Sequence, residues 1–204
     1  MSYPDFFDKV PRITMRDPLA EFLGAAAHGV MEYSYVDAVR LAGHSCPTVA
    51  ATYLMARSAL AALYPDALPE RGAIRVDLPG QRQDGVTGVI ANVLSLLTGA
   101  TEDSGFKGLG GRFDRRRLLV FGTPIAGEIR LTRLDTRESA TASAQLDRVS
   151  GDSRLRELMQ RCVSGTATAD EARLFQTLWQ ERVRKLLIDH ADDPDVIVVQ
   201  YSKG

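Results

Sequence analysis

The sequence has few of the side chains that most often mark a functional site. Its 204 residues include two cysteines, three histidines and one tryptophan. Two cysteines are too few for an iron–sulfur cluster, which takes about four protein ligands, mostly cysteines. Cys46 and Cys162 lie far apart in unlike contexts. We therefore expect free thiols in a reducing compartment, not a disulfide.

An excess of charge of one sign and long hydrophobic runs are also missing. The 25 basic and 26 acidic side chains nearly cancel, so no global field attracts nucleic acid or an anionic membrane. Residues 1–6 have neither a basic start nor a long apolar stretch, and no later run reaches the length of a membrane span. These absences predict a cytoplasmic protein that binds neither nucleic acid nor membrane.

What is present predicts a globular α+β protein. The chain is 45% hydrophobic and 25% charged, and its patterns alternate between the helical and the extended period. We expect a small mixed or antiparallel sheet packed with helices. Helices are expected over residues 18–27, 34–43, 47–64 and 86–97, and strands over 73–78, 118–121 and 128–134.

The last third of the chain has a different composition. From about Ser139 it is rich in Ser, Ala and Thr, and then forms two amphipathic helices, of which the longer opens with a capping box at Thr168. The apolar run 196–199 predicts a final strand buried on both faces. We expect a domain over 1–138 and an extension over 139–204 that packs on this domain or on a dimer partner.

The most informative segment is Gly43-His44-Ser45-Cys46-Pro47. Pro47 suits the first position of a helix, which makes Cys46 the expected N-cap residue. A thiol there meets unpaired backbone N–H groups and the positive end of the helix dipole, and both favour the thiolate. The alternative is a buried small thiol beside a capping histidine.

Metal ligation follows from the ligand types near this turn. His28, at the end of the helix expected over 18–27, could join His44 and Cys46. Three protein ligands leave an open position on a divalent transition-metal ion, with zinc the first candidate. Asp84 or Glu32 could add an oxygen ligand or orient an imidazole.

A glycine-rich loop over 105–112 carries Lys107 and Arg112. Its spacing does not match a P-loop, and it does not lead directly into a helix. Two interpretations remain, a lid whose Lys107 and Arg112 contact an anionic small-molecule ligand, and a flexible connector.

The segment Ala42-Gly43-His44-Ser45-Cys46-Pro47, followed by an alanine-rich helix, resembles the FmdE-like family of formylmethanofuran dehydrogenase components, whose signature is His-Gly-His-x-Cys-Pro-Gly. The likeness extends over 84–99 and 105–108. It implies an α+β domain, an intimate homodimer and a transition-metal ion, often zinc, held by His44 and Cys46. The chain has Ala42 and Thr48 where the signature begins and ends with His and Gly.

Three functions are consistent with these observations. The first is a metal-dependent enzyme acting on a small anionic or carbonyl compound, with Asp84 as the general base. The second is a non-enzymatic metal-binding or ligand-binding module, or an accessory to a redox enzyme system. The third is metal-free catalysis with Cys46 as nucleophile and His44 as base.

Overall fold

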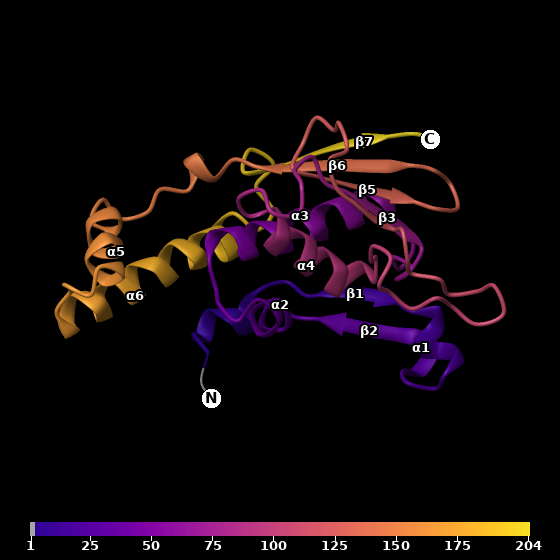
Figure 1. Cartoon of the computed structure of the whole chain (residues 1–204), viewed down its shortest axis with the longest axis horizontal. Helices are drawn as coiled ribbons and strands as arrows, with labels where there is room; N and C mark the ends of the chain where they lie inside the picture. Colours follow the sequence, from indigo (N-terminus) through magenta and orange to yellow (C-terminus); the bar gives the residue numbers. More distant parts are fainter. Residues whose placement is uncertain (1–2) are drawn as a thin grey trace.

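Helix α3 (Pro47–Leu63) runs through the centre of the computed structural model, which describes residues 3–204 (Figure 1). As predicted, Pro47 occupies its first turn and Cys46 is its N-cap residue. Four of its alanines are buried, Ala50, Ala51, Ala56 and Ala59. Small side chains allow the neighbouring elements to pack closely against the helix backbone.

A five-stranded sheet covers one side of α3 (Figure 1). The strand order is β4-β3-β5-β6-β7, and all neighbours are antiparallel except β3 and β4. Buried residues such as Ile74 and Val76 alternate with the more exposed Arg75, so one face of the sheet packs in the core. The strands are β3 (Ile74–Asp77), β4 (Leu119–Val120), β5 (Ile129–Arg133), β6 (Ser139–Ala144) and β7 (Ile197–Ser202).

The opposite side of α3 packs against helices α2 and α4, below which lies a two-stranded sheet (Figure 1). The predicted capping box of Ser34 and Asp37 opens α2, and Gly43 ends it with a positive φ of 75°. Gly99 ends α4 in the same way. These elements are β1 (Ile13–Arg16), β2 (Val30–Tyr33), α2 (Tyr35–Ala42) and α4 (Thr87–Thr98).

Helices α5 (Leu155–Val163) and α6 (Ala169–Arg184) form an arm that extends from the body (Figure 1). The predicted capping box of Thr168 and Glu171 opens α6. A π-helical turn, η4 (Lys185–Asp189), then leads the chain back to β7. Because β6 and β7 continue the sheet begun by β3 and β5, the expected boundary between 138 and 139 falls in the hairpin between β5 and β6.

Two expectations about single elements were wrong, and one strand was not predicted. Helix α1 (Pro18–Phe22) stops well before residue 27, because Gly24 takes a φ of 68° and the Ala25 N–H donates back to Ala20 O. Strand β7 is an edge strand with its last residues exposed, not a strand buried on both faces. The polar segment Ser139–Ala144 forms β6, which was not predicted.

The α+β fold class itself is confirmed. Three short 3-10 segments complete the element list, η1 (Asp5–Lys9), η2 (Ala27–Gly29) and η3 (Leu146–Arg148). Within residues 3–204, no helix combines the length and the apolar character needed to cross a bilayer.

Candidate functional site

Cys46 lies at the start of α3, half-buried, with extended backbone geometry (φ −148°). Its Sγ accepts a hydrogen bond from the Val49 N–H at 3.5 Å. The sulfur therefore faces the first turn of the helix, where unpaired N–H groups and the helix dipole attract negative charge.

His44 precedes it by two residues and is exposed. Its Nδ1 lies 2.9 Å from the carbonyl oxygen of Ala42. Because a carbonyl oxygen can only accept, Nδ1 carries a proton in this contact, so the neutral form of the ring has its lone pair on Nε2. A neutral imidazole with a free Nε2 is suited to ligate a metal ion.

Ser45, between these two residues, is held by the arm and by α2. Its main-chain oxygen accepts hydrogen bonds from Trp179 Nε1 at 3.0 Å and Gln180 Nε2 at 3.2 Å. Its hydroxyl donates to Gln180 Oε1 at 3.1 Å and lies 2.9 Å from the Tyr35 hydroxyl. The turn is thus fixed from two sides. From the sequence, the apolar stripe that carries Trp179 predicts only a packing face. The hydrogen bond from Trp179 to Ser45 was not predictable, because no local pattern links residues 134 positions apart.

The other predicted metal ligands lie elsewhere. His28 is exposed in η2, next to α1, and Figure 1 places α1 and the start of α3 at opposite ends of the body, leaving aside the arm of α5 and α6. Glu32 lies on β2 and pairs with Arg12 at 2.6 Å. No group of three or more His, Cys, Asp or Glu side chains able to hold a metal ion forms within residues 3–204. The grouping of His28, His44 and Cys46 is therefore not found within this part of one chain.

The remaining predicted site residues occupy loops. Asp84 is exposed, and its Oδ2 accepts from the Gln81 N–H at 2.7 Å, which stabilises the turn before α4. Lys107 is exposed in the glycine-rich loop. Arg112, in the same loop, lines a pocket of about 420 Å³ together with Pro18 at the start of α1.

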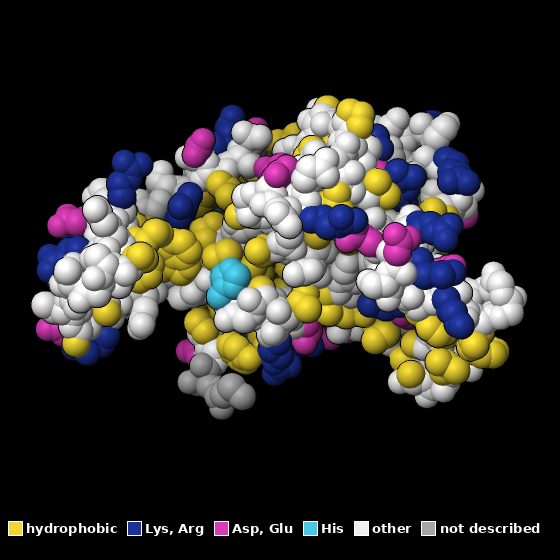
Figure 2. Space-filling model, viewed as in Figure 1, with side chains coloured by type: hydrophobic (Ala, Val, Ile, Leu, Met, Phe, Trp, Pro, Cys, Tyr) yellow, Lys and Arg dark blue, Asp and Glu magenta, His cyan; other side chains and the backbone are white. Residues whose placement is uncertain are grey.

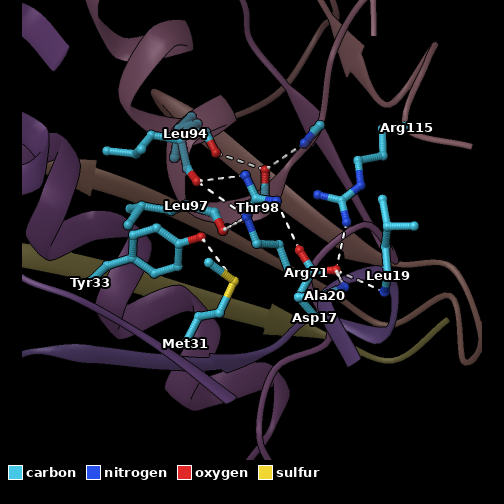
Figure 3. A network of polar contacts seen from close by, with 12 residues as sticks. Asp17, Leu19, Ala20, Met31, Tyr33, Arg71, Leu94, Leu97, Thr98 and Arg115 are labelled. Carbon is cyan, nitrogen blue, oxygen red and sulfur yellow. Dashed lines mark hydrogen bonds and ion pairs between the residues drawn. The ribbon is translucent and has the colours of Figure 1, made fainter. Parts of the chain in front are cut away.

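At this end of the molecule the structure holds a buried ion network that the sequence did not indicate (Figure 3). Asp17, only 3% exposed, accepts from Arg115 Nη2 at 2.6 Å and from Arg71 Nη1 at 3.0 Å. It also accepts from the N–H groups of Leu19 and Ala20, which makes it the N-cap residue of α1. The network ties α1 to two later loops.

Burial alone would raise the pKa of the Asp17 carboxyl, but the hydrogen bonds from Arg115 and Arg71 outweigh it and hold this pKa below its ordinary value. Asp17 is therefore a carboxylate in the folded protein at neutral pH. Its charge is shared by two guanidinium groups.

Comparisons with known proteins add a likeness of fold. No protein-family model matches the chain, and no curated protein matches it. Among solved structures, the chain is similar to a tungsten formylmethanofuran dehydrogenase FmdE-like protein from Syntrophus aciditrophicus, with 15% identity and a TM-score of 0.46. The similarity covers 84% of this chain and 73% of that one. At this level it describes the course of the chain, and no residue role is taken from it.

Proposed function

We propose that this protein binds a divalent transition-metal ion, zinc foremost, through His44 Nε2 and Cys46 Sγ. The proposal rests on the hydrogen bonding of His44 and on the position of the Cys46 sulfur. The hydrogen bond from His44 Nδ1 to Ala42 leaves Nε2 free, and Cys46 Sγ lies at the positive end of α3. Imidazole nitrogen and thiolate sulfur are ligands that zinc commonly takes in proteins.

The contacts of Ser45 support the proposal, because a metal site needs donors held in place before the ion arrives. Trp179 and Gln180 both bind the Ser45 main chain, between the two ligand residues. The Tyr35 hydroxyl contacts its side chain from α2. The backbone of the turn therefore has little freedom to reorganise.

The two donors of one chain are fewer than the three or four protein ligands usual for zinc. We infer that the protein is a homodimer in which a second copy completes the coordination. The arm supplies an apolar surface for such an interface, since Val163 on α5 is 84% exposed and Met159 is 37% exposed. Figure 2 shows further hydrophobic side chains between the arm and the body.

A bound ion of this kind polarises a carbonyl group or activates a water molecule. The substrate class that we propose is a small anionic or carbonyl compound. Trp179, which contacts the turn, also lines a pocket of about 430 Å³ between α5, α6 and the segment over 146–156. The alternative is an accessory module that binds the ion without turnover.

Elemental analysis of anaerobically purified protein tests the proposal. We expect a transition-metal ion that is lost in His44→Ala and in Cys46→Ser. Its amount should be about one per chain if the second copy contributes His28, and about one per two chains if it contributes its own His44 and Cys46. Cys162→Ser is the matched control, because Cys162 is the second free, half-buried thiol and lies on α5. His28→Ala tests whether His28 of a second copy is a ligand, since His28 does not reach the turn within its own chain.

Two results would overturn the proposal, an absence of metal after reconstitution and full retention of metal by the Cys46→Ser variant. The first would favour the thiol as a nucleophile. In that case an alkylating reagent should modify Cys46 faster than Cys162 in metal-free protein.

A further inference from the structure

The pocket beside Arg112 is a separate site, at the end of the body where α1 begins and far from the start of α3 (Figure 1). It has a volume of about 420 Å³, within the range of small-molecule sites. Three arginines line it, Arg71, Arg112 and Arg115, together with the apolar side chains of Phe113 and Leu134. Figure 2 shows Lys and Arg side chains gathered at this end of the molecule.

Arg115 is 8% exposed, and several of its N–H groups have no acceptor. Nη2 donates to Asp17, whereas the buried Nε has no hydrogen-bond partner. Nη1 makes no hydrogen bond with the residues over 3–204 either, but unlike Nε it is not fully enclosed by the chain. Arg71 differs, because its Nε and Nη2 donate to the carbonyl oxygens of Leu96 and Leu97 at the end of α4. The unpartnered Nε is costly to bury but is enclosed by the chain, so the donor that Arg115 offers to a ligand in the pocket is Nη1.

The charges around the pocket are not balanced. Arg71 and Arg115 share the single carboxylate of Asp17, which leaves one positive charge. Arg112 adds a second, since it makes no ion pair within the part of the chain that the structure describes and instead lies 4.7 Å above the Phe113 ring.

The two carboxylates that line the pocket offset this charge only in part. Glu70 lies 3.5 Å from Arg16, and Asp114 lies 2.7 Å from Arg116. Both of these arginines are outside the lining of the pocket. Asp114 is neutralised by Arg116, whereas Glu70 shares Arg16 with Glu21, which lies closer to Arg16, at 2.5 Å. The pocket therefore keeps an excess of about one positive charge.

The loop that carries these arginines has an unfavourable backbone geometry. Phe113 and Arg117 have φ angles of 64° and 58°, in the left-handed region that bulky side chains rarely adopt. Hydrogen bonds from Thr101 to Arg115 O and from the Arg115 N–H to Phe106 O hold the loop in place. Strained residues that the fold maintains in this way cluster at binding sites.

We propose that this pocket binds a small molecule through an oxyanion, a carboxylate or phosphate group held by Arg112 and Arg115. Guanidinium groups bind both oxyanions through paired, charge-assisted hydrogen bonds. Phe113 and Leu134 would contact the rest of the molecule. The site is independent of metal binding at His44 and Cys46, so either proposal can fail without the other.

Calorimetric titration of the full chain with inorganic phosphate, and separately with succinate, tests the site at constant ionic strength. We expect one of the two to bind once per chain, and the preferred probe identifies the oxyanion. Arg112→Gln should weaken binding by about tenfold or more, the effect of losing a charge-assisted hydrogen bond. Arg117→Gln is the control, because it removes the same charge from the same loop at a residue outside the pocket lining.

A second measurement locates the bound anion. Amide chemical shifts should change for residues 70–72 and 111–115 in the wild type and not in Arg112→Gln. The proposal is overturned if neither anion binds at millimolar concentration, or if Arg112→Gln and Arg117→Gln change the affinity equally. Equal changes would mean that the anion responds to general surface charge.

Discussion

The Trp179 indole donates a hydrogen bond to the main-chain oxygen of Ser45, at 3.0 Å. This contact joins the arm to the turn that carries the proposed metal ligands. Gln180, the next residue, makes two hydrogen bonds to the same serine. Because Trp179 is the one tryptophan of the chain, its fluorescence reports on the arm and the turn at once.

We predict that Gln180→Ala lowers the free energy of unfolding by about 1–2 kcal/mol, because two part-buried hydrogen bonds are lost. The emission of Trp179 should shift to longer wavelength as the turn loosens. Urea unfolding followed by circular dichroism and by fluorescence measures both effects. Gln176→Ala is the control, since Gln176 is exposed on the same helix. Equal stability of the two variants would show that the contact does not hold the arm.

Asp17→Asn should destabilise the fold by about 3–5 kcal/mol, because two buried guanidinium groups lose their shared carboxylate. Asparagine keeps an oxygen that can still accept from the first N–H groups of α1. The lost stability would therefore come mainly from the removed negative charge and less from weaker capping of α1. Asp114→Asn, on the exposed loop, is the comparison and should change stability far less.

The same carboxylate predicts a dependence of stability on pH. Its pKa is lower in the folded chain than the ordinary value of 3.8, so the unfolded chain binds a proton first as the pH falls. The free energy of unfolding should thus decrease below about pH 4, as the pH approaches the folded-state pKa. Asp17→Asn should flatten this part of the profile, measured by chemical unfolding at a series of pH values. An unchanged slope would contradict the assigned role of Asp17.

Three tyrosines should resist ionisation in alkali. Burial raises the pKa of Tyr64 to about 12, and burial also raises the pKa of Tyr35 and Tyr53. Stability from these neutral phenols is fully present below about pH 10 and is lost as the pH rises above it. At about pH 11, tyrosinate absorbance should be well below that of the denatured chain. Full ionisation without loss of structure would refute this prediction.

Val163→Asp tests the proposed homodimer. The side chain is 84% exposed, so the change should alter the stability of a single chain by no more than about 0.5 kcal/mol. In an interface formed by the arm, the buried charge should weaken association by at least about tenfold. Sedimentation velocity over a range of protein concentrations measures the strength of association, with Gln160→Asp on the same helix as control. A wild-type monomer at all concentrations would contradict the homodimer.

The sequence predicted the elements whose ends carry specific capping residues. Ser34 with Asp37, Pro47 after Cys46, and Thr168 with Glu171 each mark a helix start that the structure confirms. These signals are local, because a side chain satisfies N–H groups within the same turn. The helix expected over 18–27 ends early because Gly24, within that range, takes the left-handed conformation.

The contacts that build both sites were not predictable in the same way. Arg71 and Arg115 lie 54 and 98 positions from Asp17, and a lone Asp before Pro18 indicates only a helix cap. One of the two interpretations of the glycine-rich loop made it a lid whose Lys107 and Arg112 contact an anionic ligand of the site at Cys46. The loop lies instead at the end of the molecule where α1 begins, a position fixed by tertiary contacts.

The contact between Trp179 and Ser45 also has a consequence for the order of events during synthesis. The turn over 44–46 leaves the ribosome long before α6, and at about 5–20 residues per second the 134 residues between them take roughly 7–27 s. During that interval the nascent chain exposes His44 and Cys46 on a turn without its partners from the arm. The proposed metal site can therefore assume its final geometry only near the end of translation, when nearly the whole chain is available to fold.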